Sequence, residues 1–170
     1  MTKRDLSASD LRLRFAVRAD LPVLSDVFRR ASLSHEGDRA NLLAHPDALE
    51  FSARAVEAGR VRVAATDNRV VGFATVLVTE RIGELDDLFV DPDWRRRGIA
   101  TALVRDALDR AAHQGLTHIE VTANGHALAF YESVGFVSDG MRQTRLGPGH
   151  RMHIEFPPAQ PLLPLSPLAA

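Results

Sequence analysis

The sequence contains no cysteine, a single lysine (Lys3) and a single tyrosine (Tyr131). Without cysteine the chain can form no disulfide, no thiolate metal site and no covalent intermediate on a cysteine nucleophile. No stretch approaches the roughly 18 apolar residues of a membrane-spanning helix, and residues 1–15 lack the apolar core of a signal peptide. We therefore expect a cytoplasmic protein with no membrane partner.

The balance of charge also excludes some partners. The 170 residues carry a formal net charge of -1, which predicts no nucleic-acid partner. The chain length fits one domain with a proper hydrophobic core. Among the seven histidines, His150 and His153 are close in sequence, but a strand would place them on opposite sides. We therefore expect no metal site.

Hydrophobic periodicity predicts alternating strands and helices along the first half of the chain. A strand is predicted at 11–17, a helix from Asp20 with Pro22 in its first turn, and one or two short helices with a loop over 32–47. Strands at 60–65 and 69–79 follow, joined by a turn at Asp67-Asn68.

The next strand, Glu84 to Val90, has an irregular pattern. Leu88 and Val90 share one face, whereas strict alternation would place Leu85 on the other. One inserted residue between positions 85 and 88 would bring all three to one side, as a β-bulge does. A central strand that is buried on both faces would explain the same pattern.

The second half predicts a βαβ unit, so its two strands are expected to be parallel. A helix begins at Gly98 and ends near Gly115, a strand spans 117–123, and a second helix runs from Asn124 to Gly135. The last strands are predicted at 136–146 and 151–156, with a turn at Gly147 to His150 between them. Five of the nine prolines lie in the tail, 157–170, which is predicted to be extended, disordered or packed as an arm on a neighbour.

Three consecutive arginines, Arg95 to Arg97, lie where the helix begins. A helix N-terminus favours anions, so this placement predicts a bound anion, and Gly98 leaves its backbone open to phosphate. Thr101 adds a hydroxyl in the first helical turn. The segment matches neither a Walker A loop nor a dinucleotide-binding glycine motif. A solvated arginine cluster is the alternative interpretation.

The segment Arg95-Arg96-Arg97-Gly98-Ile99-Ala100 resembles the acyl-coenzyme A motif of the GNAT superfamily of N-acetyltransferases, R/Q-x-x-G-x-G/A. A strand precedes the motif, and Asn124, Tyr131 and Gly135-Phe136 follow at the family's spacing, so the resemblance covers about 12–156. It implies a mixed α/β fold in which helices flank a central, mostly antiparallel sheet with one parallel, splayed strand pair. It also favours the bulge, which this family has in the same strand.

The resemblance implies acetyl-coenzyme A as the cofactor. The backbone of the bulged strand would bind the pantetheine arm together with Asn124, and the arginine loop would bind the pyrophosphate. Tyr131 would protonate the leaving thiolate, whose pKa of about 8.5 is close to that of a phenol, about 10. An N–H near Phe89 or Val90 would stabilise the oxyanion. The cofactor-binding residues implied are Leu88, Phe89, Val90, Arg95, Arg96, Arg97, Gly98, Ile99, Ala100, Thr101, Asn124 and Tyr131.

A general base must deprotonate the acceptor amine, and three carboxylates crowd the bulged strand. Glu84, Asp86 and Asp87 are close enough in sequence for their charges to raise at least one pKa. Glu84 lies where some GNAT members have a catalytic glutamate, so it is the first candidate and Asp86 the second. The alternative is that these acids are solvated or attract a cationic substrate.

The sequence thus predicts an acetyltransferase domain at 1–156, a proline-rich tail at 157–170, and direct acetyl transfer to a primary amine. The acceptor is a small molecule or a peptide, with a cationic small molecule favoured, and residues 32–51 and 147–150 are expected to shape its site. A homodimer is possible. The alternatives are a catalytically inactive acyl-coenzyme A sensor or partner module, and a simple anion-binding protein.

Overall fold

The computed structural model describes residues 11–67 and 69–157. The strands, in chain order, are β1 (Arg12–Phe15), β2 (Val61–Thr66), β3 (Arg69–Thr79), β4 (Ile82–Val90), β5 (His118–Ala123), β6 (Val137–Thr144) and β7 (Gly147–Glu155). The α-helices are α1 (Leu21–Ser32), α2 (Glu36–Ala44), α3 (Ala53–Glu57), α4 (Ile99–His113) and α5 (Leu128–Ser133). Four 3-10 turns supplement them, at Arg18–Asp20, Pro46–Leu49, Pro92–Trp94 and Gly125–Ala127.

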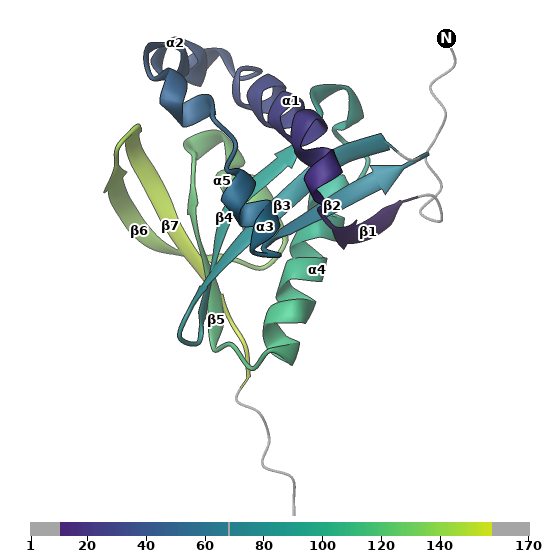
Figure 1. Cartoon of the computed structure of the whole chain (residues 1–170). Coiled ribbons are helices and arrows are strands. Elements are labelled where there is room, and N and C mark those ends of the chain that lie inside the picture. The colour runs from purple at the N-terminus through teal and green to yellow at the C-terminus, as the bar shows by residue number, and fades with distance from the viewer. Residues whose placement is uncertain (1–10, 68, 158–170) are drawn as a thin grey trace, which may run out of the picture.

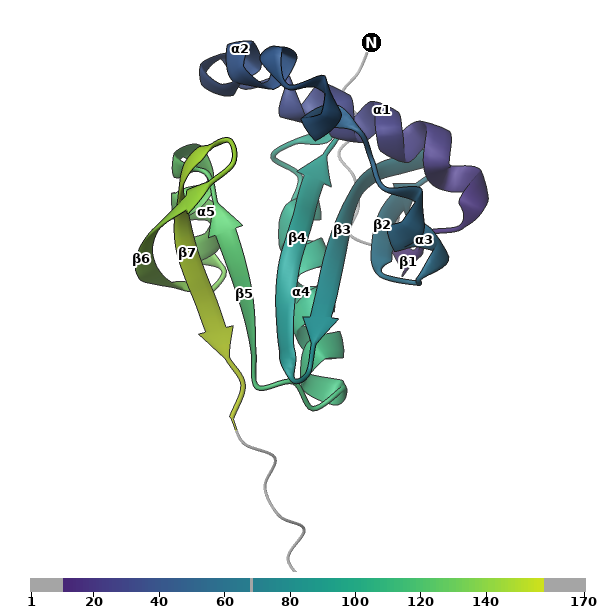
Figure 2. The same ribbon diagram turned by 60° about the vertical axis from the view of Figure 1, so that its left-hand side comes forward.

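All seven strands form one sheet in the order β1-β2-β3-β4-β5-β7-β6. Every neighbouring pair is antiparallel except β4 and β5, which are parallel. Helices α4 and α5 pack on one face, while α1 and α3 cover the β2, β3 and β4 part of the other (Figures 1 and 2). The predicted fold class is confirmed.

Strand β4 contains the predicted bulge. Leu85 pairs with Val76 and Asp87 pairs with Thr75, so Asp86 is the inserted residue. As a result, Leu88 falls on the same side as Leu85, and both pack in the core beneath α4. Phe89 instead packs in the second core, beneath α1. The bulge therefore reconciles the irregular pattern of this strand with a sheet that has helices on both faces.

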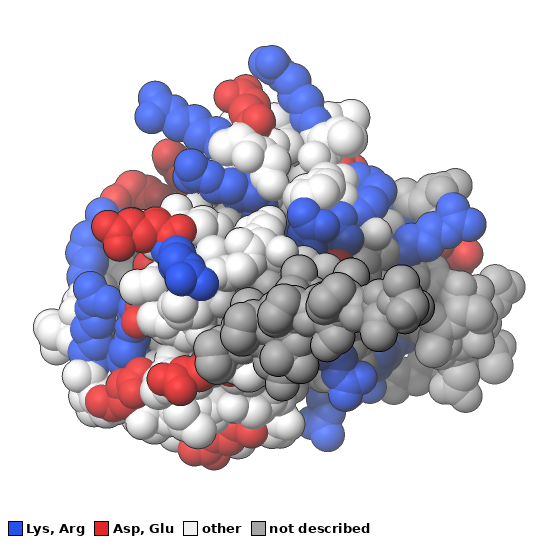
Figure 3. Space-filling view, turned by 90° about the horizontal axis from the view of Figure 1, so that it is seen from below, with Lys and Arg blue, Asp and Glu red and all other residues white. Residues whose placement is uncertain are grey.

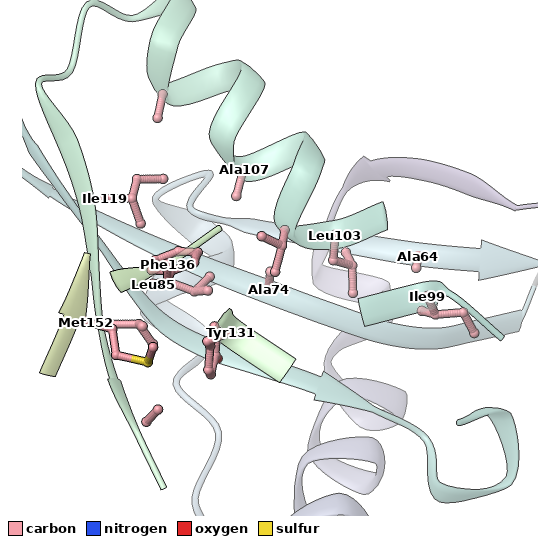
Figure 4. Close-up of a cluster of buried hydrophobic side chains, with 14 of the residues drawn as sticks. Ala64, Ala74, Leu85, Ile99, Leu103, Ala107, Ile119, Tyr131, Phe136 and Met152 are labelled. Atoms are coloured by element: carbon pink, nitrogen blue, oxygen red, sulfur yellow. The ribbon is translucent and has the colours of Figure 1, made fainter. Parts of the chain in front are cut away.

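The core beneath α4 depends on a glycine in β3. A Cβ added at Gly72 would lie 3.2 Å from Ile99 Cγ2 and 3.4 Å from Leu103 Cδ1. It would also lie 3.0 Å from the Phe89 carbonyl oxygen of β4, so a side chain at this position would crowd both the neighbouring strand and α4. Figure 4 shows this core, in which Leu103 and Ala107 of α4 face the sheet. The position of α4 matters because its first residues follow the arginine loop.

The structure corrects the predicted turn at Gly147 to His150. These residues begin β7, and Thr144 pairs with Gly147 across a tighter turn at Arg145 and Leu146. A Cβ at Gly149 would lie 2.6 Å from Thr122 Cγ2, so this glycine permits close strand packing and does not form a turn.

Helix α5 begins at Leu128, after a 3-10 turn, and not at Asn124. The turn residue Asn68 and the tail from 158 onward lie outside the described residues.

Within the described ranges, no helix has the length and apolar character that a membrane span requires. On the described part of the face seen in Figure 3, both basic and acidic side chains occur.

Candidate active site

The site is built around the point where β4 and β5 separate. The two strands pair only from Ile82–His118 to Glu84–Glu120. Beyond this point they diverge, as Figure 2 shows, and residues 85–90 and 121–123 have no strand partner on their facing edges. We call these two facing segments the splay. Their backbone groups can bind an extended ligand as a further strand.

The loop that follows β4 is anchored by a buried carboxylate. Asp91 is only 1% exposed and accepts hydrogen bonds from Arg30 at 2.9 Å and Arg69 at 3.1 Å. It also caps the 3-10 turn by accepting a bond from the Asp93 backbone N–H at 3.0 Å. These contacts fix the start of the loop against α1 and β3.

The end of the loop has the backbone conformation of an anion site. Arg96 and Gly98 both have positive φ, 63° and 75°, and α4 begins at the next residue, Ile99. Left-handed residues beside a helix N-terminus turn successive N–H groups toward one point, which suits phosphate. A Cβ at Gly98 would meet nothing within 4 Å, so the space in front of the backbone is open. These residues fit a pyrophosphate.

The three arginines of the loop have different surroundings. Arg95 donates to Ser34 Oγ at 2.7 Å and so ties the loop to the end of α1. Arg97 stacks over the Trp94 ring, with 4.7 Å from Cζ to the centroid. Arg96 is exposed. Arg95 therefore positions the loop, while Arg96 is the arginine whose side chain is most open to a ligand.

The remaining predicted cofactor residues lie at the start of α4 and at the end of β5. Thr101 and Ala100, in the first turn of α4, are half-buried, and Ile99 is buried in the core. Ile99 can thus offer a ligand only its backbone. Asn124 is exposed directly after β5, and its side chain does not cap the following turn. The arginine loop with the first turn of α4 and the residue after β5 thus lie at the ends of the two diverging strands.

Tyr131 extends from α5 into the core. It is 7% exposed and packs edge-on against Phe130 and Phe136. Figure 4 shows it close to Leu85 of β4 and Phe136. Burial raises the pKa of Tyr131 above the usual range for a phenol, and the charge of Asp87 raises it further. Tyr131 therefore remains protonated near neutral pH.

Asp87 is the carboxylate with the most perturbed acidity. Burial raises its pKa to about 6; the neighbouring charge of Asp86 adds to the rise, and the hydroxyl of Thr75 opposes it. Asp86 is more exposed, and partial desolvation and the charge of Glu84 raise its pKa as well. The expectation of at least one raised carboxylate pKa is confirmed, although burial contributes more than like charge.

Glu84, the first candidate for the base, has a cationic partner. Arg151 Nη1 of β7 donates to it at 3.2 Å and also to Thr122 Oγ1 at 3.1 Å. Arg151 also pairs with Glu120. Glu84 thus belongs to an ion-pair network that joins β4, β5 and β7 next to the splay.

Residues 32–51, which were expected to shape the acceptor site, include α2 and cross the sheet at the end where β4 and β5 diverge (Figure 2). The rings of His35 and His126 stack with centroids 3.7 Å apart, and Asp38 lies 3.5 Å from His126. Asn41 of α2 donates to the Leu146 carbonyl at 3.0 Å. The α2 region is thus joined to both the start of α5 and the β6–β7 turn.

No group of three or more potential metal ligands occurs in the described parts of the chain.

The acetyltransferase (GNAT) family model matches residues 26–136, well over half of the chain. The chain belongs to this family. N-alpha-acetyltransferase RimI of Mycobacterium tuberculosis is 38% identical over 88 residues, which are 47% of this chain and 53% of that protein. Human N-acetyltransferase 8 is 38% identical over 87 residues, 46% of this chain and 38% of the relative. The alignments thus span about half of these relatives or less.

Solved GNAT structures show the same fold at low identity. PaiA N-acetyltransferase from Thermoplasma acidophilum, in complex with coenzyme A, has a TM-score of 0.73 and 16% identity over 86% of this chain and 99% of that one. YncA from Salmonella typhimurium, with its cofactor acetyl-CoA, has a TM-score of 0.64 and 19% identity over 89% and 97% of the two chains.

Sequence reasoning recognised the crowding of Glu84, Asp86 and Asp87 but did not predict that Asp87 would be the most buried of the three. The bulge distinguishes the two aspartates, because it places Asp87 opposite Thr75 and leaves Asp86 as the inserted residue. The signal was present in the strand pattern, which already located the bulge between positions 85 and 88.

Proposed function

We propose that this protein transfers an acetyl group from acetyl-coenzyme A to a primary amine by direct attack in a ternary complex. The proposal rests on one observation: β4 separates from β5 immediately beyond Glu84 and Glu120, beside a loop whose backbone is shaped for phosphate. Family membership and structural neighbours that contain coenzyme A or acetyl-CoA support the choice of cofactor.

The chain offers separate contacts for the two ends of the cofactor. The loop from Arg96 to Thr101 would hold the pyrophosphate, and the free edge at Leu88, Phe89 and Val90 would hold the pantetheine with Asn124. When bound, acetyl-coenzyme A supplies an acetyl group activated by a thiol leaving group. A backbone N–H at Phe89 or Val90 is then available to stabilise the oxyanion that forms.

Asp87 is the residue that we assign as general base. With a pKa of about 6 it is mostly ionised at neutral pH and still basic enough to accept a proton from an ammonium group. Glu84 is held by Arg151, so its role in this proposal is to position Arg151 and β5. Asp86, which is more exposed, attracts the cationic acceptor.

Tyr131 is the group that we assign to the leaving thiolate. Its raised pKa keeps the phenol protonated as a hydrogen-bond donor. Part of that rise comes from the charge of Asp87, so a proton taken up by Asp87 removes it and lowers the pKa of Tyr131. Proton uptake from the acceptor thereby makes Tyr131 a better acid for the leaving group.

The acceptor is an amine on a small molecule or a peptide, and the acidic side chains of β4 favour one that is cationic. The relative RimI is an N-alpha-acetyltransferase, which supports an α-amine, including that of a peptide, as one class to test. Helix α2 and the β6–β7 turn, which Asn41 joins, would border the path by which such an acceptor reaches β4.

The first test is calorimetric titration with acetyl-coenzyme A, coenzyme A and pyrophosphate at two salt concentrations. We expect tight acetyl-coenzyme A binding that persists in high salt, because the pantetheine contacts are not ionic. Release of free thiol would then be followed with a panel of diamines, aminoglycosides, amino acids and peptides.

Each outcome has a distinct meaning. Binding with turnover supports the enzyme. Binding without turnover on the whole panel supports a catalytically inactive sensor or partner module. Equal, weak and salt-sensitive binding of all three ligands would refute the proposal and leave a simple anion site.

A further inference from the structure

Thr75 contributes an unusual buried hydroxyl to β3. The residue is only 1% exposed, and its Oγ1 forms no hydrogen bond in the described structure. Buried polar groups are nearly always paired, so an unpaired hydroxyl at this depth needs an explanation. Valine would fill the same space without leaving a polar atom unpaired.

The bulge in β4 brings this hydroxyl next to one particular carboxylate. With regular pairing beyond Val76–Leu85, Thr75 would lie opposite Asp86. The inserted Asp86 moves the register by one residue, so that Asp87 becomes the cross-strand partner of Thr75. Cross-strand partners have Cβ atoms about 5 Å apart, within reach of a hydroxyl donor and a carboxylate.

We infer that the Thr75 hydroxyl is a positioning group for Asp87, donating a hydrogen bond to its carboxylate while Asp87 accepts the acceptor's proton. This inference rests on the proposed function. A carboxylate oxygen that accepts from Thr75 leaves the second oxygen free for the amine. The hydroxyl therefore fixes the orientation of the Asp87 carboxylate and also increases the fraction of Asp87 that is ionised at a given pH.

The structure does not contain this hydrogen bond, because Thr75 Oγ1 has no partner among the described residues. Thr75 already lowers the pKa of Asp87 against the larger effect of burial, although its Oγ1 does not complete a hydrogen bond of standard geometry. Catalytic hydrogen bonds are often long in a protein without its ligands and tighten when the ligands bind.

Several ionisable groups lie near Asp87, and the carboxylates among them oppose its ionisation. Asp86, on the same strand, raises the pKa of Asp87, and Glu84 acts on Asp86, while Arg151 of β7 partly offsets the charge of Glu84. Tyr131 of α5 is neutral near neutral pH and is itself affected by Asp87. Thr75, in contrast, lowers the pKa of Asp87 and so favours its ionised form.

The test compares Thr75→Val and Thr75→Ala, which remove the hydroxyl, with Thr75→Ser, which keeps it. The pH dependence of kcat/KM is measured from pH 5 to 9, and the Asp87 carboxyl is titrated by carbon-13 NMR in the free protein and in its complex with coenzyme A. Thr66→Val is the matched control, because Thr66 also has a buried, unpaired hydroxyl but pairs across the strands with Arg69.

We expect Thr75→Val and Thr75→Ala to raise the Asp87 midpoint by about one pH unit, since a hydrogen bond to a charged group has about that effect. Activity at pH 5.5 should then fall roughly tenfold through kcat, with little loss at pH 9. Thr75→Ser should restore the wild-type profile, and Thr66→Val should leave it unchanged.

An unchanged Asp87 midpoint in a folded variant without the hydroxyl would overturn the inference, even if the wild type is an active acetyltransferase. A wild type without acetyl transfer would instead refute the proposed function. The NMR titration separates the two failures because it needs no turnover.

Discussion

Asp87 of β4 and Tyr131 of α5 are electrostatically coupled, since the charge of the carboxylate raises the pKa of the phenol. The two residues are 44 positions apart in sequence, and the splay brings them together because α5 follows the strand that diverges from β4. When the charge of a base affects the pKa of an acid in this way, a change in the protonation of one alters the acidity of the other during a turnover. This pairing is the chemical centre of the proposed mechanism.

Replacement of the phenol tests the acid role. Tyr131→Phe should lower kcat by about 100-fold, a typical loss for a general acid, because the thiolate loses its donor. Acetyl-coenzyme A affinity should stay within about threefold, since the ring and its packing against Phe136 are retained. Steady-state kinetics and calorimetry on the same preparation measure both quantities. Unchanged turnover would show that Tyr131 is a packing residue.

Replacement of Asp87 tests the base by its pH dependence. Because the pKa of Asp87 is about 6, wild-type kcat/KM should fall as pH drops below this value. Asp87→Asn should lose about 100-fold in rate at pH 8 and also lose this acidic limb. Glu84→Gln is the comparison, and it should keep the limb because Arg151 already pairs with Glu84. The reverse pattern would return the base role to Glu84.

The same substitution should make the protein more stable. Folding raises the pKa of Asp87 above its ordinary value of 3.8, so the ionised form destabilises the folded state. This penalty is absent below pH 3.8, grows as pH rises toward 6 and is complete above it. Asp87→Asn should therefore gain about 1–3 kcal/mol of unfolding free energy at pH 8 and little at pH 4. Urea denaturation at both pH values measures the gain, with exposed Asp109→Asn as a control.

Much of the fold was predictable because strong periodicity marks its elements. The bulge was accessible too, since Leu85, Leu88 and Val90 share a face only if a residue is inserted. Sequence could not show which carboxylate remains unpaired, because Arg151, the partner of Glu84, lies 67 residues away.

The glycines at 147 and 149 illustrate the opposite case. Glycine is common in turns, so sequence favoured a turn there, but the close approach of Thr122 across the sheet requires a strand glycine at 149. Local sequence propensity carries no information about a contact with a strand that is distant in sequence.

The buried Asp91 should support both stability and cofactor affinity. Asp91→Asn removes the charge that holds Arg30 and Arg69, which should cost about 2 kcal/mol of unfolding free energy, since both arginines can still reach water. Asp93→Asn is the matched control, because its carboxylate also pairs with Arg30 but is 73% exposed, and it should cost less than about 1 kcal/mol. Only Asp91→Asn should also weaken acetyl-coenzyme A binding. Equal effects of the two variants would mean that the loop does not depend on this anchor.

The two ends of α4 allow the phosphate site to be tested without confusing binding with strain. Gly98 precedes the helix and Gly115 follows it; both have positive φ, 75° and 72°, and neither has a neighbour within 4 Å of an added Cβ. Gly98→Asp and Gly115→Asp should therefore each cost about 1–2 kcal/mol from backbone strain, with the smaller loss at Gly98 because the helix N-terminus stabilises a carboxylate. Only Gly98→Asp would place a carboxylate where the pyrophosphate is proposed to bind, and it should reduce acetyl-coenzyme A affinity at least 100-fold by calorimetry. If both variants bind the cofactor as the wild type does, then the loop from Arg96 to Gly98 does not hold the pyrophosphate, whatever the splay binds.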